Sequence, residues 1–415
     1  MDGKEPVLFH TISASRDTDA KTARGGLSRM VRHLAKDIGP RAPGSKGERA
    51  AARFVQREIE AAGLSVQSMD FRTPETCAWS KLVPHLMTAA GVALFPASGH
   101  LSYLLVVTGF LLYLCEEFGR SPLALLLPRR PSMNLTARVE PLREPRHKVV
   151  LLAHLDSPRS TFYYRPSLMG LYRAALMVVF LCHAAIFMLF TVAYGGHLLR
   201  MDRDLLALFW HLGLALAVPP LLAGLSLFAK AVAGRPTPGG NDNASGLAVL
   251  VEASRIYSRR RPHHVELWLA ATGASDASGL GARRLVRKHR RDLRGAYFIV
   301  VEGVGRGFPV CFKREGRLLR FRANRRLTAV IKRVCETHVH HGSGLMNNRL
   351  YLGEGFQLLS RGHRAVTVRC WEDARVPRYW RWGKDDLDNV DPRSMRTAMD
   401  FVIAVIDAID RGGLD

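Results

Sequence analysis

Hydrophobic residues fall into two kinds of segment along the chain, short runs and much longer ones. The short runs have the length and the β-branched content of strands, and they occupy residues 64–71, 149–153, 265–271, 297–301 and 365–368. Segments with one apolar side at helical spacing lie before and after them, at 26–38, 50–62 and 394–409, and further helices are expected between them, after residue 246 and at 282–293. Strands that alternate with helices predict an α/β domain, with a mixed, largely parallel sheet sandwiched by helices.

Four longer apolar segments interrupt this alternation. Residues 174–195 and 205–229 each reach the roughly 17–25 residues that a membrane-spanning helix needs. Residues 82–95 and 101–114 are shorter, so they are compatible with a tight transmembrane hairpin, a re-entrant hairpin or a soluble helical pair. We expect about four transmembrane segments arranged as two hairpins.

Two hairpins return the chain to the side of the membrane that it left, so the intervening parts can form one domain. The predicted divisions are a disordered N-terminus at 1–22, the α/β domain at 23–80, 119–165 and 234–415, one membrane hairpin at 81–118 and a transmembrane hairpin at 166–233. His183 and His211 lie inside the longer segments, and we expect them to hydrogen-bond neighbouring helices rather than to carry protons or metal.

Two polar stretches carry candidate chemistry. The loop Gly239–Gly246 presents one carboxylate, Asp242, among small and turn-forming residues just before an apolar helix. The run 149–153 ends in His154, and Asp156 follows two residues later. A histidine at the end of a buried strand, with a carboxylate to orient its ring, is typical of a metal ligand and its support. An Asx-turn before a helix is the alternative for the loop.

Together these stretches resemble metallopeptidase family twenty-eight, the co-catalytic zinc aminopeptidases, which carry a strand followed by His-x-Asp and a Gly-x-Asn-Asp-Asn-x-Ser-Gly loop. The order of helix, Gly-Pro-Arg, Gly-Ser, helix, glycine and strand over residues 26–71 is also similar to the start of that family. The resemblance implies that His154 is the first zinc ligand, that Asp156 orients it and that Asp242 bridges two zinc ions. Glu302 stands where the family usually has aspartate as a ligand.

The remaining family positions are changed in this sequence. The family has a Glu-Glu pair, the proton acceptor and a ligand, where this chain has Ser275 and Asp276. A serine hydroxyl cannot take the proton, so Asp276 is either a shorter ligand or a substitute base. Arg381 stands at the position of the last histidine ligand, and arginine cannot coordinate a metal. We expect one zinc ion, at His154, Asp242 and Glu302; a second is doubtful.

The replacement of a ligand by arginine leads to a hypothesis about charge. Buried carboxylates that lose a dication need another positive charge, so Arg381 is expected to form an ion pair with Asp276, with a second contact to Asp242 as an option. Two functions follow: a membrane-anchored zinc aminopeptidase-like hydrolase with weak or no ordinary peptidase activity, or an inactive pseudopeptidase that serves as a binding or scaffold domain. If the chain is an enzyme, it is a zinc-dependent metallopeptidase.

Charge and cysteine content indicate the binding partner, the orientation in the membrane and the redox compartment. The net charge of +24 favours an acidic partner, and we expect the anionic leaflet of a bilayer rather than nucleic acid, because the basic helix expected at 282–293 lacks interleaved aromatic residues. Basic residues flank the domain side of the hairpins, which predicts a cytoplasmic domain. Six scattered cysteines fit a reducing compartment. Histidine clusters at 263–264 and 338–341 are further, weaker metal candidates. Peptide substrate or protein partner is not specified by the sequence.

Overall fold

A nine-stranded mixed sheet forms the centre of the α/β domain in the computed structural model, which describes residues 25–337, 343–350, 352–372 and 379–415. Its strands follow the order β1-β2-β6-β3-β7-β11-β8-β10, with β9 paired to β8. The bounds are β1 (Val66–Pro74), β2 (Arg129–Val139), β3 (His147–His154), β6 (Val265–Thr272), β7 (Tyr297–Val301), β8 (Phe308–Glu315), β9 (Phe321–Arg322), β10 (Gly344–Asn348) and β11 (Arg364–Trp371). The predicted disordered N-terminus and the cluster at 338–341 lie outside the described residues.

The four neighbouring strands β6, β3, β7 and β11 run parallel, whereas β1, β2 and β8 add antiparallel pairs at the sides. These central strands are buried on both faces, which is why their sequences are nearly continuous runs of valine, leucine, isoleucine and alanine. The predicted α/β fold with a largely parallel sheet is therefore confirmed.

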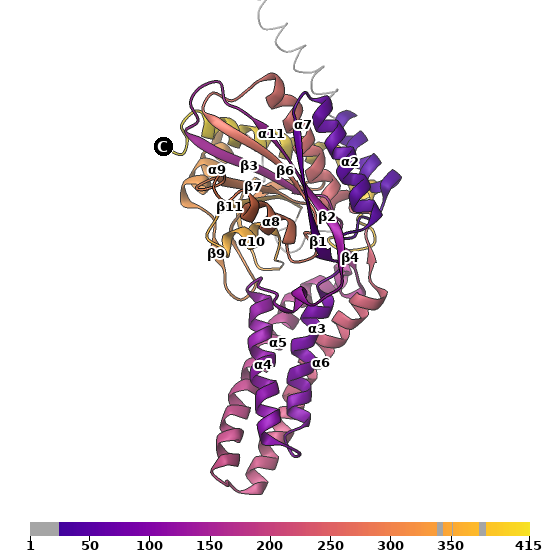
Figure 1. Cartoon of the computed structure of the whole chain (residues 1–415), viewed down its shortest axis with the longest axis vertical. Helices are drawn as coiled ribbons and strands as arrows, with labels where there is room; N and C mark the ends of the chain where they lie inside the picture. The colour runs from indigo at the N-terminus through magenta and orange to yellow at the C-terminus, as the bar shows by residue number, and fades with distance from the viewer. Residues whose placement is uncertain (1–24, 338–342, 351, 373–378) are drawn as a thin grey trace, which may run out of the picture.

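Helices cover both faces of the sheet, and the side chains of β3 show how. Val149 and Leu151 pack in one apolar core with α2, α7, α9 and α11, whereas Val150 and Leu152 pack in a second core with α8 and α10. The alternation follows from the two-residue period of a strand and gives the helix–sheet–helix layers of Figure 1. The helices are α2 (Lys46–Ala61), α7 (Gly246–Arg259), α8 (Leu280–Lys288), α9 (Arg325–Thr337), α10 (Glu354–Leu359) and α11 (Pro392–Asp410).

Several short elements complete the domain. Residues 25–32 are helical and continue into η1, as the apolar pattern over 26–38 predicts. The basic helix α8 ends at Lys288 rather than at 293, because the chain then turns through His289 to Gly295. The remaining elements are η1 (His33–Ile38), η2 (Leu123–Leu125), β4 (Arg159–Ser160), η3 (Phe162–Tyr164), β5 (Arg235–Pro236), η4 (Gly240–Ser245) and η5 (Leu387–Asn389).

Four apolar helices form a bundle that extends from one end of the α/β domain, and the whole domain lies at that one end (Figure 1). They are α3 (Ala78–Ala93), α4 (Gly99–Glu117), α5 (Pro166–Leu198) and α6 (Arg203–Ala233). Among the described residues, three helices are long and apolar enough to cross a membrane: Gly99–Glu117, Gly170–Leu198 and Arg203–Ala233. The expected count of four is therefore not reached by length and composition.

Helix α3 is the one that falls short. Its 16 residues extend about 24 Å at 1.5 Å per residue, less than the roughly 30 Å of a hydrocarbon core. It packs closely on α4, where a Cβ atom on Gly109 would lie 3.0 Å from the carbonyl oxygen of Pro84. Small residues at such contacts let two backbones approach each other.

The two histidines in the long apolar segments behave differently. His183 of α5 lies between α3 side chains, with its Nε2 2.8 Å from Nδ1 of His85 and its Nδ1 3.2 Å from the hydroxyl of Thr88. The expected bond to a neighbouring helix is therefore present for His183. For His211 the expectation is wrong, because this exposed ring bonds the carbonyl of Ala207 in its own helix, at 2.7 Å.

Candidate active site

The candidate site lies at the carboxyl ends of the parallel strands. His154 is the last residue of β3, and Glu302 follows β7 directly. Strand β6 ends at Thr272, and the turn that follows it carries Ser275 and Asp276. The crevice beyond the carboxyl ends of the strands is where open α/β sheets bind ligands, so the topology brings together residues that are far apart in the sequence.

The carboxylate of Asp385 fixes the backbone of the loop that carries Asp242. Asp385 accepts hydrogen bonds from the backbone N–H groups of Asn241 and Asp242, at 2.7 and 3.2 Å. The amide of Asn243 donates to the carbonyl of Val301 at the end of β7. These bonds position the Asp242 carboxylate over the sheet. Burial and the nearby Asp242 charge raise the pKa of Asp385 to about 7.

Asp156 lies beside the ring of His154. Its Nδ1 lies 2.8 Å from the carbonyl oxygen of Asp156, whereas the nearest carboxylate oxygen of that residue is 3.5 Å away. The Asp156 carboxylate also accepts the backbone N–H groups of Ser275 and Asp276, each at 2.8 Å. Both the backbone carbonyl and the carboxylate of Asp156 therefore lie near Nδ1 of His154, and the orienting role of the carboxylate stays a prediction.

The three predicted zinc ligands do converge. Nε2 of His154 lies 3.2 Å from Oδ1 of Asp242. Asp242 and Glu302 face the same buried guanidinium group, that of Arg369, whose Nη2 and Nη1 lie 3.6 Å from Oδ2 of Asp242 and 3.9 Å from Oε2 of Glu302. Within the described ranges, no group of three histidine, cysteine, aspartate or glutamate side chains is arranged to hold a metal ion. Their roles as ligands therefore stay predictions.

Arg369 was missed by the sequence reasoning. It is 1% exposed and comes from β11, between the buried residues Val368 and Cys370. Burial by itself would raise the pKa of Asp242. The positive charges of Arg369 and His154 outweigh that effect and hold the pKa of Asp242 well below its usual range. A single basic residue inside an apolar strand was the signal available, because such a charge is retained in a core only with partners.

The predicted ion pair between Arg381 and Asp276 is present. Nη1 of Arg381 lies 2.6 Å from Oδ1 of Asp276, whereas Asp242 pairs with Arg369 instead. Burial alone would raise the pKa of Asp276, but the charges of Lys230, Arg381 and Lys81 outweigh it and lower that pKa. A carboxylate with a lowered pKa is a weak proton acceptor, which disfavours Asp276 as the substitute base. Ser275 contributes its backbone N–H to the turn.

Glu354 is a second residue that the sequence reasoning missed. Its backbone N–H donates to Glu302 at 3.1 Å, and its carboxyl group accepts the hydroxyl of Thr272 at 2.8 Å. Burial raises the pKa of Glu354 to about 8, and the adjacent Glu302 contributes in the same direction. A buried carboxyl that stays neutral near pH 7 adds no negative charge beneath the site.

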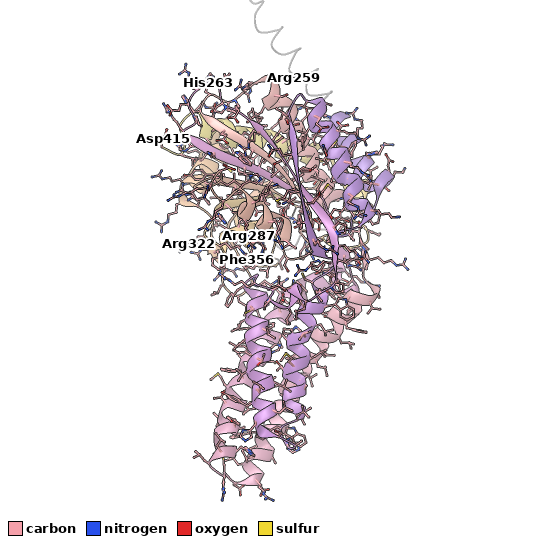
Figure 2. All side chains as sticks on the ribbon, viewed as in Figure 1. Arg259, His263, Arg287, Arg322, Phe356 and Asp415 are labelled. Carbon is pink, nitrogen blue, oxygen red and sulfur yellow. The ribbon has the colours of Figure 1, made fainter. Side chains whose placement is uncertain are left out.

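The remaining metal candidates lie elsewhere. His263 and His264 precede β6 and donate their backbone N–H groups to Asp410. They stand at the amino end of that strand, and Figure 2 shows His263 at the end of the domain away from the bundle. This weaker metal candidate therefore lies away from the site. The other cluster, at 338–341, is outside the described residues.

Arg41 joins three segments under the site. It is fully buried and donates hydrogen bonds to the carbonyl groups of Leu34, Gly39, Leu155, Pro238 and Gly239. Burial lowers its pKa to about 10. The Gly-Pro-Arg motif, which the family resemblance marks as structural, thus ties the end of β3 to the loop that carries Asp242.

Substitution of Glu315 tests the buried carboxyl groups around the sheet. Burial raises the pKa of Glu315 to about 8, so the unfolded chain releases this proton near pH 4.5 and the folded chain only near pH 8. Stability from this group is present below pH 4.5 and lost as the pH rises to about 8. We expect Glu315→Gln to raise the free energy of unfolding by about 1–2 kcal/mol at pH 8 and not at pH 4. Denaturant unfolding at both values measures this, and an equal effect at both would contradict it.

Comparison with known proteins agrees with this geometry. Residues 227–406 match the sequence model of peptidase family M28. The zinc aminopeptidase BSAP from Bacillus subtilis has a similar structure, with a TM-score of 0.54 at 12% identity over 92% of this chain and 94% of that one. The aminopeptidase from Aneurinibacillus sp. strain AM-1 gives 0.54 at 13% identity, over 93% of each chain. A Bacteroides thetaiotaomicron glutaminyl cyclase gives 0.52 at 13% identity, over 92% of this chain and 97% of that one. No curated protein matches the chain in sequence.

The fold is the mixed α/β fold of the M28 aminopeptidases. The match over residues 227–406, together with the shared fold, bears out the resemblance to family M28 that the motifs indicate. The solved structures share the fold with this chain, and one of them is described as a zinc aminopeptidase.

Proposed function

We propose that this chain is a membrane-anchored M28-fold protein in which two arginines stand in place of metal ions, and that it serves as a binding domain without ordinary aminopeptidase activity. The observation that carries the proposal is Arg369. Its guanidinium group is placed between Asp242 and Glu302, two of the three residues that would hold zinc. A dication and a buried guanidinium would compete for the same two carboxylates and repel each other.

Arg381 supports the same conclusion at the second position. It stands where the family has a histidine ligand, and it neutralises Asp276 directly. Ser275 replaces the family's proton acceptor, and the lowered pKa of Asp276 makes that residue a poor substitute. The donor set of this chain therefore does not fit a pair of zinc ions, and we derive no hydrolytic step through one.

A second candidate function keeps one metal ion. His154, Asp242 and Glu302 lie at neighbouring strand ends, and Nε2 of His154 already faces Asp242. If Arg369 moved aside, these three side chains would offer the imidazole and carboxylate donors that zinc prefers. The bound metal would then supply a Lewis acid and an activated water for a weak hydrolase.

The zinc content of the purified full chain separates the two functions. We expect wild type to contain no stoichiometric zinc after dialysis against micromolar zinc, and to release no product from aminoacyl-naphthylamide substrates. Asp242→Ala should leave both readings unchanged. We expect Arg369→Ala to gain zinc, because it removes the competing cation. One zinc per chain in wild type, lost together with hydrolysis in Asp242→Ala, would establish the one-metal hydrolase and refute the proposal.

The membrane anchor is proposed as four helices, with α3 crossing at a place where the bundle thins the bilayer. Support comes from its close packing on α4 and α6 in the bundle, because a short helix can be accommodated by local thinning. The domain side of the bundle carries Lys81, Arg120, Arg129, Arg130, Arg165, Lys230 and Arg235. This excess supports a cytoplasmic domain held against the anionic leaflet.

The proposed cytoplasmic orientation predicts whether a protease outside the cell can cut the α/β domain. We expect trypsin added to intact cells to leave the α/β domain uncut, although it is rich in lysine and arginine, and to cut it once the membrane is permeabilised. Immunoblotting with an antibody against the C-terminal helix α11 gives the readout. Cleavage in intact cells would place the domain outside.

A further inference from the structure

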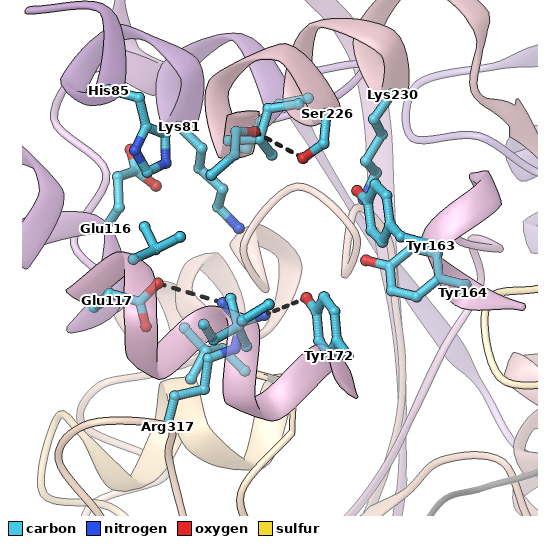
Figure 3. A pocket seen from close by; sticks show the side chains of 18 of the residues that line it. Lys81, His85, Glu116, Glu117, Tyr163, Tyr164, Tyr172, Ser226, Lys230 and Arg317 are labelled. Carbon is cyan, nitrogen blue, oxygen red and sulfur yellow. Dashed lines mark hydrogen bonds and ion pairs between the residues drawn. The ribbon is translucent and has the colours of Figure 1, made fainter. Parts of the chain in front are cut away.

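A cavity of about 460 Å³ lies where the helical bundle meets the α/β domain. Part of its wall comes from the candidate active site, with Ser275, Asp276 and Arg381. The opposite wall comes from the membrane helices α3, α4, α5 and α6. Figure 3 shows side chains from these helices and from the domain facing a common space. One cavity thus joins the site to the level of the bilayer.

The polar end of this cavity is lined by four basic side chains, Lys81, Lys230, Arg317 and Arg381, and by three carboxyl groups, those of Glu116, Glu117 and Asp276. Glu116 accepts a hydrogen bond from the hydroxyl of Ser121. Two arginines there are matched, since Arg317 lies 3.3 Å from Glu117, and Arg381 pairs with Asp276. Two lysines also line the space, Lys81 from α3 and Lys230 from α6. Among the described residues, neither lysine has a carboxylate within ion-pair distance.

Lys230 is the more informative of the two lysines. It is 9% exposed, and its ammonium group lies 5.7 Å from the centre of the Tyr164 ring. Figure 3 shows it beside Tyr163 and Tyr164, with Lys81 entering from another helix. The charge of Lys230 acts on Asp276, which Arg381 already pairs directly. A buried ammonium group with no carboxylate at ion-pair distance is costly, so a ligand with negative charge would be favoured between these groups.

The other end of the cavity is apolar and opens toward lipid. Leu176 and Val179 of α5 and Leu227 of α6 form its wall. Val178 and Leu222 also line it, yet they are 47% and 60% exposed on the outer side of the bundle. Side chains that belong both to the cavity and to the lipid-facing surface mark an opening at the depth of the bilayer.

We propose that this cavity binds an anionic phospholipid, with its phosphate between Lys81 and Lys230 and the beginning of one acyl chain between α5 and α6. The tyrosine hydroxyls beside Lys230 can donate hydrogen bonds to the phosphate oxygens. A water-soluble phosphate would use the same cations and leave the apolar end unfilled. The proposal does not depend on whether the neighbouring site holds zinc, and a bound headgroup would face Asp276 and Arg381.

Retention of lipid by the purified full chain tests this inference. The protein is reconstituted in nanodiscs of phosphatidylcholine with a minority of phosphatidylglycerol, returned to detergent, and examined by native mass spectrometry. We expect about one phosphatidylglycerol per chain, and about tenfold weaker retention in Lys81→Met and in Lys230→Met, which corresponds to one lost charge-assisted contact. Lys332→Met, at an exposed lysine of α9, is the matched control and should retain lipid as wild type does.

A second pair of variants tests the apolar end. Ala175 lines the cavity, whereas its exposed neighbour Ala174 is not among the lining residues. We expect Ala175→Trp to reduce retention of phosphatidylglycerol and Ala174→Trp to leave it unchanged. Millimolar inorganic phosphate should not displace the lipid. Retention of phosphatidylcholine equal to that of phosphatidylglycerol, displacement by phosphate alone, or unchanged retention in both lysine variants would overturn the inference.

Discussion

Replacing Arg369 with leucine is expected to lower the free energy of unfolding of the α/β domain by about 3–5 kcal/mol, the usual cost of removing one partner from a buried charge network. Arg369 is 1% exposed and faces Asp242 and Glu302, which are themselves 5% and 2% exposed. Without the guanidinium group two carboxylates would share one dry pocket. Amide hydrogen exchange of β3 and β7 in the detergent-solubilised chain reports the domain separately from the helical bundle.

Two further measurements test whether the loss of stability in Arg369→Leu comes from repulsion between the two carboxylates. Adding Asp242→Asn to Arg369→Leu should recover a large part of the loss, because it removes one of the two repelling carboxylates. Zinc should stabilise Arg369→Leu by mass action and leave wild type unchanged, since only the variant offers an unoccupied carboxylate pair. If Arg369→Leu unfolds as wild type does, or if Asp242→Asn adds to its loss, the guanidinium does not stand in for a metal ion.

Replacing Arg41 with methionine is expected to cost about 4 kcal/mol or more of domain stability, a loss that only a few mechanisms produce. The side chain donates to five carbonyl groups, and methionine offers no donor. Each buried carbonyl left without a partner costs about 1–3 kcal/mol. Hydrogen exchange in β3 and in the loop 239–246 is the measurement, because both are tied by these bonds.

Matched variants distinguish lost hydrogen bonds from lost charge. Arg41→Lys keeps the charge but cannot span five carbonyls with one ammonium group, so we expect it to recover less than half of the loss. Arg29→Met is the control, because the Arg29 side chain is 66% exposed and makes one long ion pair. Recovery of full stability by Arg41→Lys would show that charge alone mattered at this position.

The arrangement explains how an M28 fold can be kept with altered site residues. Three buried or half-buried carboxylates, Asp242, Asp276 and Glu302, lie at or near the carboxyl ends of the central strands. Their charge must be balanced for the strand ends to pack. Arg369 and Arg381 provide that balance from β11 and from the segment before η5. Under the proposed function, one electrostatic requirement accounts for both arginines.

Much of the fold could be predicted from local patterns. The buried run before His154, the strand 297–301 and the apolar helical face of 394–409 correspond to β3, β7 and α11. These elements are long or strongly patterned, so their apolar residues alone predict which side chains are buried. The helix expected over 282–293 was overextended, because a basic run does not show where a backbone turns. Length and composition support three spans, and the fourth, α3, stays a proposal, since a short apolar run does not fix its relation to a bilayer.

The candidate site divides in the same way. Motifs at single places in the chain identified His154, Asp242 and Asp276, and a charge argument predicted the contact of Asp276 with Arg381. Arg369 could not be assigned from its neighbours, because its partners are distant in sequence and come near only through the parallel pairing of β11 with β7.

By itself the sequence determined the α/β class, the family resemblance, the apolar segments and the identity of the groups able to carry charge, because each is encoded in residues close together along the chain. Only the tertiary structure decided which cation balances which carboxylate, that the backbone carbonyl of Asp156 lies 2.8 Å from Nδ1 of His154, and that a cavity joins the site to the bundle. These depend on distances between segments far apart in the chain, and electrostatic interactions in a buried site change strongly over a few ångströms.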